Sequence, residues 1–70
     1  MRQVIEIQVN GEPRRVADPA TVAALLDEMQ LTGKRLAVER NGEIVPKSRH
    51  GQTSLASGDR LEIVVAVGGG

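Results

Sequence analysis

The sequence predicts an α+β domain in which one amphipathic helix lies across a single mixed sheet of four to five strands. Two observations predict this class. Several short segments alternate apolar and polar residues, as half-buried strands do, and one segment carries apolar residues at helical spacing. The length of 70 residues leaves room for one small domain only.

The first hairpin is predicted by an alternating segment, a turn and a return. Residues 4–9 carry apolar side chains at every second position, which indicates a strand with one buried face. Asn10 and Gly11 suit the tight turn with positive φ that joins antiparallel strands, so residues 12–16 are expected to run back along the first strand. Because Pro13 offers no backbone N–H, this second strand is expected at a sheet edge.

A helix is predicted after the first hairpin. Thr21 is the expected N-cap, Asp18-Pro19 is an alternative start one turn earlier, and Gly33 suits the left-handed position just past the end. No other helix is expected. Its buried face consists of residues at i, i+3, i+4 and i+7: Val22, Leu25, Leu26 and Met29.

The second half of the chain predicts a further hairpin and a last strand. Residues 36–45 contain a second Asn-Gly turn with a short return arm, and residues 60–67 alternate again. Residues 46–59 are polar and rich in turn residues, with a short extended piece expected at residues 53–55. This ββαββ order is that of the β-grasp, or ubiquitin-like, fold. We expect residues 1–67 to form it, with the first and last strands parallel at the sheet centre.

Composition excludes several classes of function. Nine basic and nine acidic residues balance, so no long-range field attracts nucleic acid or an acidic membrane. The chain has no aromatic residue for base stacking and no cysteine for disulfides, thiol catalysis or thiolate metal sites. The sequence has neither the pattern of a signal peptide nor an apolar run long enough to span a membrane, so a cytoplasmic protein is expected.

No internal catalytic or metal site is predicted. His50 is the single histidine, and in a polar loop it is expected to be solvated or lightly hydrogen-bonded. The acidic residues are dispersed along the strands. The short basic clusters, Arg14-Arg15 and the pair Lys47 and Arg49, are expected to be solvated, with contact to an acidic partner surface as the alternative.

The remaining chemical group is the C-terminus. Residues 68–70 are expected to form a flexible tail of three glycines, which lack side chains and can thread a narrow channel. The α-carboxylate of Gly70 is ionised at neutral pH and can attack the α-phosphorus of ATP held by a partner enzyme. An inert glycine-rich terminus, or a remnant of cloning, is the alternative.

Three stretches, which together cover nearly the whole chain, resemble the sulfur carrier proteins of thiamine biosynthesis, the ThiS family. They are VNGEPRRVADPATVAALLDEM, LAVERNGEIVPKSRH and TSLASGDRLEIVVAVGGG. The last is the most specific, because a Leu-x-x-Gly-Asp turn at residues 55–59 leads into a Glu-Ile strand and a glycine terminus. One departure is His50, where many relatives carry Trp.

The resemblance implies a protein cosubstrate rather than an enzyme, with no cofactor bound. A ThiF-like adenylating enzyme of the ubiquitin-activating type would charge Gly70 with AMP from ATP. A persulfide sulfur donor would then convert it to a thiocarboxylate, with Gly68 and Gly69 as the tail. A ThiG-like thiazole synthase would take the sulfur into the thiazole of thiamine. A molybdopterin synthase small subunit, a ubiquitin-like protein modifier and an interaction module with an inert tail remain as alternatives.

Docking to both enzymes is expected to use the face of the sheet beside the tail. On the last strand, Val64 and Ala66 alternate with the buried residues, and Ala37 is expected close to them. These three residues would form a small apolar patch of the kind that marks partner sites. The alternative is that a neighbouring strand or loop covers them.

Overall fold

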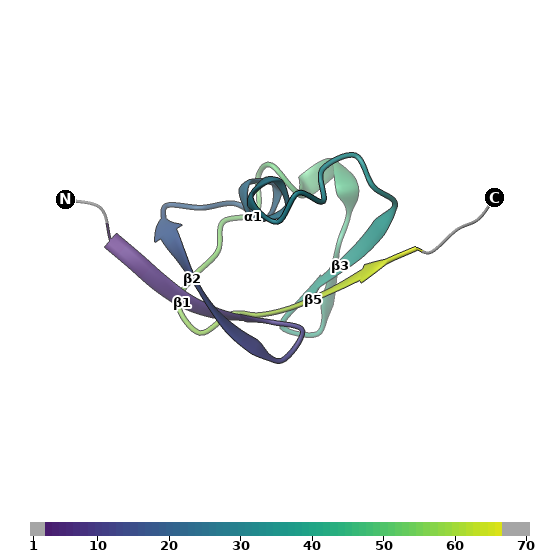
Figure 1. The fold of residues 1–70 in the computed structure, drawn as a ribbon. Coiled ribbons are helices and arrows are strands. Elements are labelled where there is room, and N and C mark those ends of the chain that lie inside the picture. Colours follow the sequence, from purple (N-terminus) through teal and green to yellow (C-terminus); the bar gives the residue numbers. More distant parts are fainter. Residues whose placement is uncertain (1–2, 67–70) are drawn as a thin grey trace.

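A computed structural model describes residues 3–66 of the chain. Within them a five-stranded sheet has the order β2-β1-β5-β3-β4, and one α-helix lies across one of its faces (Figure 1). This confirms the predicted α+β class and the ββαββ order. The elements are β1 (Gln3–Val9), β2 (Glu12–Asp18), α1 (Val22–Glu28), β3 (Leu36–Arg40), β4 (Glu43–Val45), the 3-10 helix η1 (Lys47–Arg49) and β5 (Arg60–Val65).

The first and last strands are neighbours at the centre of the sheet, as predicted. β1 pairs parallel with β5, with Gln8 opposite Arg60 and Val9 opposite Leu61, while β3 pairs antiparallel with the other side of β5. The edge position predicted for the strand that contains Pro13 is confirmed, because β2 pairs with β1 and ends the sheet. Since β1 and β5 are parallel, the start of β1 and the end of β5 lie at opposite ends of the molecule (Figure 1).

The hydrophobic core lies between α1 and the inner face of the sheet. It is aliphatic throughout, because the chain has no aromatic residue to fill it. Every strand contributes at least one buried residue, and α1 contributes three. Its members are Ile7, Val9, Val16, Val22, Leu25, Leu26, Val38, Val45, Leu55, Leu61 and Ile63.

The start of α1 is as predicted, but its end is not. Thr21 is the N-cap, and its hydroxyl oxygen accepts a hydrogen bond from the Ala24 N–H at 3.1 Å. The left-handed residue directly after the helix is Gln30, with φ of 61°, and not Gly33. The N–H groups of Gln30 and Leu31 donate to the carbonyls of Asp27 and Leu26, which is the Schellman pattern. Helix α1 therefore ends about one turn earlier than predicted from the position of Gly33.

The connection from β4 to β5 also differs from the prediction. Residues 47–49 form the 3-10 helix η1, where only turns were expected. The extended piece expected at residues 53–55 is reduced to one isolated bridge between Ser54 and Thr21, and the Thr53 carbonyl accepts a hydrogen bond from the Val22 N–H. The connection is thus hydrogen-bonded to the start of α1, and it places Leu55 in the core.

Candidate functional site

Strand β5 precedes the predicted glycine tail in the sequence. A buried carboxylate, that of Asp59, fixes the start of this strand. Asp59 is 6% exposed and follows Gly58, whose φ of 88° requires a residue without a side chain. The carboxylate accepts hydrogen bonds from the Arg40 Nε at 3.0 Å, the Asn41 Nδ2 at 3.1 Å and the Ala56 N–H at 2.8 Å. Asp59 therefore joins its own turn to the β3–β4 hairpin at the point where β5 begins.

An asparagine side chain holds the other flank of β5. The Asn10 Nδ2 donates to the Ile63 carbonyl at 3.2 Å, and the Asn10 Oδ1 accepts from the Ile63 N–H at 2.8 Å. Strand β1 ends at Val9, so this amide takes the place of the next peptide group of the parallel ladder. Asn10 therefore has two roles: it forms the tight turn that its residue type predicts, and its side chain is hydrogen-bonded to Ile63 of β5.

The sheet holds the chain as far as Ala66, the last residue that the structure describes. The Ala66 N–H donates to the Arg35 carbonyl at 2.9 Å, which continues the pairing of β5 with β3. The predicted tail, Gly68, Gly69 and Gly70, lies outside the described residues, so its role remains a prediction. Any segment that follows Ala66 starts from a fixed position at the end of the sheet.

The structure brings the three predicted patch residues together on the outer face of the sheet. Val64 lies directly opposite Ala37 on β3, and Ala66 follows two positions later on the same side of the chain. All three are exposed, and Val64 is 64% exposed, so no strand or loop among residues 3–66 covers them. The alternative that a neighbouring element covers these residues is therefore wrong for this part of the chain.

Two further exposed apolar residues on this face were not predicted: Val4, which is 60% exposed at the start of β1, and Ile44. Ile44 lies on β4 opposite Glu39 and is 63% exposed. Glu39 in turn lies opposite Glu62, so two carboxylates separate Ile44 from Val64. A three-residue arm is too short to show alternation, so no sequence pattern indicates which face Ile44 occupies.

His50 was expected to be solvated or lightly hydrogen-bonded, and the structure shows the second: its side chain is buried and makes one hydrogen bond. It is 9% exposed, and its Nε2 lies 3.1 Å from the Val45 carbonyl, which accepts the hydrogen bond. Since its backbone carbonyl also accepts the Ala23 N–H, His50 packs the β4–β5 connection against α1. Its contacts are those of a structural residue.

Arg14 is also less solvated than expected. It is half-buried on the inner side of β2, where its guanidinium donates to the Glu28 Oε1 at 3.0 Å. Within residues 3–66, His, Asp and Glu side chains form no group of three or more that could hold a metal ion. Over the same range no helix has both the length and the apolar character needed to cross a membrane.

Comparison with known proteins decides the family. The model of the ThiS family matches residues 7–70, which include the last three residues of β1, the whole remaining sheet and the three C-terminal glycines. The chain belongs to the ThiS family. This confirms the resemblance predicted from the three stretches of sequence, the last of which also ends in the three glycines.

Two relatives and one solved structure agree with membership of the ThiS family. The sulfur carrier protein ThiS of Bacillus subtilis is 42% identical over 65 residues, which are 91% of this chain and 98% of that protein. A thiazole synthase of Paramagnetospirillum magneticum is 47% identical over 66 residues, which are 94% of this chain but only 20% of that protein. The crystal structure of the thiamine biosynthesis protein ThiS from Geobacter metallireducens superimposes with a TM-score of 0.80 at 30% identity, covering 94% and 100% of the two chains. This likeness confirms the predicted β-grasp fold.

Proposed function

We propose that this member of the ThiS family is a sulfur carrier of thiamine biosynthesis, and that Gly70 carries the sulfur. The observation that supports the proposal most directly is the family match, which continues through β5 to residue 70. The 42% identity with a sulfur carrier over 98% of its length supports the same role. The tail is the remaining candidate group, because the chain has no cysteine and the described residues hold no ligand set for a metal.

The chemistry we propose needs only the carboxylate of Gly70. In a ThiF-like adenylating enzyme, a carboxylate oxygen attacks the α-phosphorus of ATP, and pyrophosphate leaves. A persulfide sulfur then displaces AMP from the acyl carbon, and cleavage of the acyl disulfide by a thiol leaves the thiocarboxylate. A ThiG-like thiazole synthase transfers this sulfur to its substrate, and an oxygen from water or from the substrate takes the place of the sulfur on the acyl carbon, which returns the chain to its carboxylate form. The chain is thus a cosubstrate that partner enzymes act on, in the cytoplasm.

The patch of Val64, Ala37 and Ala66 supports docking beside the tail. Val64 and the two alanines are exposed and apolar, so burying them against a partner is favourable. Alanine loses no rotamer freedom on burial, so the cost in side-chain entropy is small. Along the chain, Val64 and Ala66 closely precede the predicted tail of three glycines. An enzyme that binds the patch is therefore close to the residues from which the tail continues.

Intact-mass measurement tests the proposed chemistry. The chain is incubated with an adenylating enzyme, ATP, a persulfide source and a thiol, and exchange of one oxygen for sulfur at Gly70 is expected. Removal of Gly69 and Gly70 should abolish the exchange. An unchanged mass with several competent enzymes would contradict the proposal, and covalent conjugates of high mass on a blot would indicate a protein modifier instead.

A matched pair of substitutions tests the docking patch. Val64→Asp should lower kcat/KM for adenylation about tenfold or more, because it puts a charge into an apolar interface. Val4→Asp is the control, since Val4 is 60% exposed on the same face but lies at the start of β1, at the other end of the sheet. Equal kinetics for the two variants would remove Val64 from the interface.

A further inference from the structure

A surface hollow lies on the other side of the sheet from the docking patch, at the same end of the molecule. It has a volume of about 440 Å³ and is bounded by one face of α1, the loop that follows the helix, the first residue of β3 and the region around η1. This is within the size range of pockets that hold a small ligand or a side chain of a partner. The floor of the hollow is aliphatic: Ala23, Leu26, Leu31 and Leu36.

The local structure explains why the hollow is there. The Schellman turn ends α1 at Glu28 and brings Leu31 back beside Leu26, through the hydrogen bond from the Leu31 N–H to the Leu26 carbonyl. His50 closes the side of the hollow next to η1 and is fixed by its bond to Val45. The walls are therefore held by backbone hydrogen bonds and by a buried side chain.

The rim of the hollow is basic. Lys34 and Arg35 lie on one side and Lys47 on the other, and no acidic residue lines it. The ion pairs found within residues 3–66 involve other arginines, so none of these three cations is neutralised by a neighbour in that range. Asp27 does not line the hollow, but it accepts a hydrogen bond at 3.4 Å from Thr32, which does. An occupant with an apolar group and negative charge would fit this rim.

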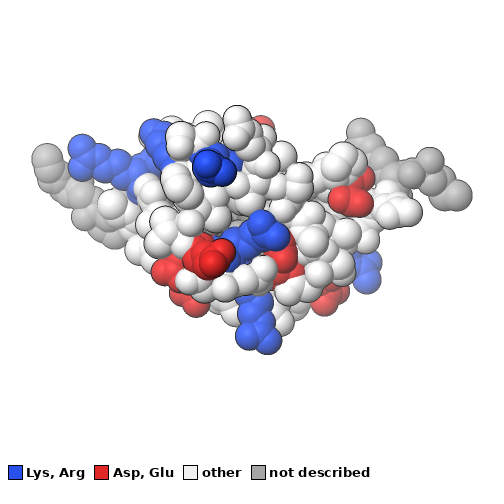
Figure 2. Space-filling model, turned by 180° about the vertical axis from the view of Figure 1, so that it is seen from behind, with Lys and Arg blue, Asp and Glu red and all other residues white. Residues whose placement is uncertain are grey.

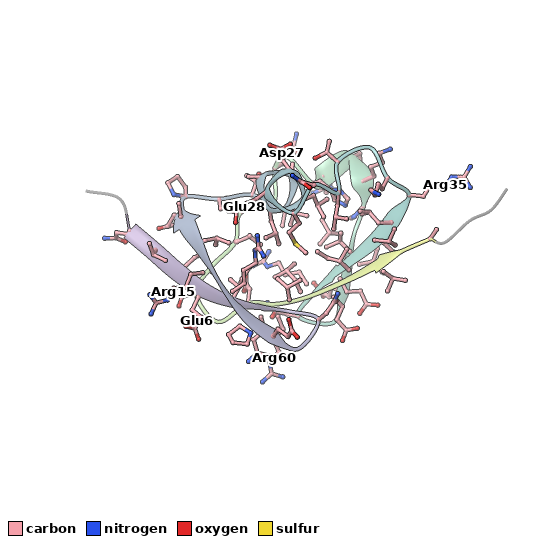
Figure 3. All side chains as sticks on the ribbon, in the orientation of Figure 1. Glu6, Arg15, Asp27, Glu28, Arg35 and Arg60 are labelled. Carbon is pink, nitrogen blue, oxygen red and sulfur yellow. The ribbon has the colours of Figure 1, made fainter. Side chains whose placement is uncertain are left out.

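A residue that lines the hollow is hydrogen-bonded to Ala66, the last described residue before the predicted tail. The Arg35 carbonyl accepts the Ala66 N–H, and Leu36 of the floor lies opposite Val65 of β5. Figure 2 shows Lys and Arg side chains at the upper left of the face seen from behind, with no Asp or Glu among them. In Figure 3 the Arg35 side chain lies beside the end of β5, far from Arg15 and Glu6 at the other end of the sheet.

We propose that this hollow seats an extended segment of the enzyme that takes the tail, with an aliphatic side chain on the floor and carboxylates against Lys34, Arg35 and Lys47. The inference rests on the proposed function, because an enzyme that draws in the tail must bring its own surface against the residues around Ala66. Opposite charges at that place speed the encounter and fix its orientation. A second contact, on the side of the sheet away from the apolar patch, would let the enzyme hold β5 from both faces.

Charge reversal with a matched control tests the proposal. The double variant Arg35→Glu and Lys47→Glu should raise KM for adenylation about tenfold at low salt, less at high salt, with kcat unchanged. The control is the double variant Arg15→Glu and Arg60→Glu, which makes the same change in net charge on exposed strand positions outside the hollow. It should stay within about twofold of the parent protein. Far-UV circular dichroism checks that both variants fold.

A second variant changes the shape of the hollow without changing its charge. Ala23→Leu places a larger side chain in the floor and keeps a good helix former in α1. It should raise KM as the charge reversals do, but independently of salt. If KM is unchanged in both this variant and the rim variant, while the parent protein is still charged at Gly70, the docking inference is wrong and the proposed function stands. If the parent protein is not charged at all, the proposed function fails first.

Direct binding tests the site without any enzyme. A synthetic peptide with one leucine between glutamates is titrated into ¹⁵N-labelled protein, and amide shifts are expected at residues 31–36 and 47–51. Hexanoate is the comparison probe, because a free amphiphilic acid shares the chemistry of the segment. Shifts with hexanoate at lower concentration than with the peptide would mark a small-molecule site and overturn the proposal. Shifts with neither probe would overturn it as well.

Discussion

Asp59→Ala is expected to bring the domain close to global unfolding. The carboxylate is buried and accepts three hydrogen bonds, from Arg40, Asn41 and the Ala56 N–H. Alanine removes the acceptor and leaves all three donors without it. One of those donors is charged, and the backbone N–H of Ala56 belongs to the turn that starts β5.

The expected loss of unfolding free energy is about 3 to 5 kcal/mol. All three bonds are accepted by a carboxylate, and a hydrogen bond to a charged group contributes about 1.5 to 3 kcal/mol, of which we take the lower end. The side chain of Arg40 is 35% exposed, so solvent screens this pair. A domain of 70 residues has a total stability of about 4 to 10 kcal/mol. Asp59 alone therefore contributes a large fraction of it.

Urea denaturation followed by far-UV circular dichroism measures this loss, since the chain has no tryptophan or tyrosine for fluorescence. Glu12→Ala is the control, because it removes an exposed carboxylate from edge strand β2 and should change stability by less than about 0.5 kcal/mol. A loss below about 1 kcal/mol in Asp59→Ala would refute the reasoning, since it would mean that the three donors find other partners.

Three further substitutions test local features of the sheet and helix. Asn10→Gly keeps the positive φ but removes both hydrogen bonds to Ile63, so the free energy of unfolding should fall by about 1 to 2 kcal/mol. Hydrogen exchange at the Ile63 amide should be faster, and an unchanged exchange rate would contradict this. Glu62→Gln relieves the like-charge pair with Glu39 and should raise the urea midpoint slightly, an effect that must shrink with added salt. Gln30→Gly should stabilise the chain by about 0.5 to 1 kcal/mol, and a lower midpoint would argue against strain at that residue.

The sheet could be predicted from sequence because its signals are local. Alternation marks the strands, and both Asn-Gly turns have the positive φ values that their residue types favour. The helix end could not be predicted, because Gln30 adopts the left-handed conformation that glycine prefers, and Leu31 packs on the core in compensation. The burial of His50 depends on contacts between the β4–β5 connection and α1, which no local pattern shows.

One part of the candidate site could likewise be predicted from the sequence, and the other part could not. Val64, Ala66 and Ala37 could be placed on one face because strand alternation fixes which side chains point away from the helix. The hollow could not be predicted, since it is formed by the helix end and the β4–β5 connection, the two places where the prediction and the structure differ.

Asp59 and Asn10 stabilise the domain, but they are not part of the surfaces proposed to bind an enzyme. Both hold β5 along its flanks before Val64, and neither side chain belongs to the docking patch or the hollow. Weakening either one should therefore reduce charging in proportion to the folded fraction, and conditions that restore folding should restore charging. Val64→Asp should instead reduce charging in protein that is fully folded. Because the two kinds of variant act on the same strand, comparing them at known folded fractions shows whether β5 serves as a scaffold, as a contact surface, or as both.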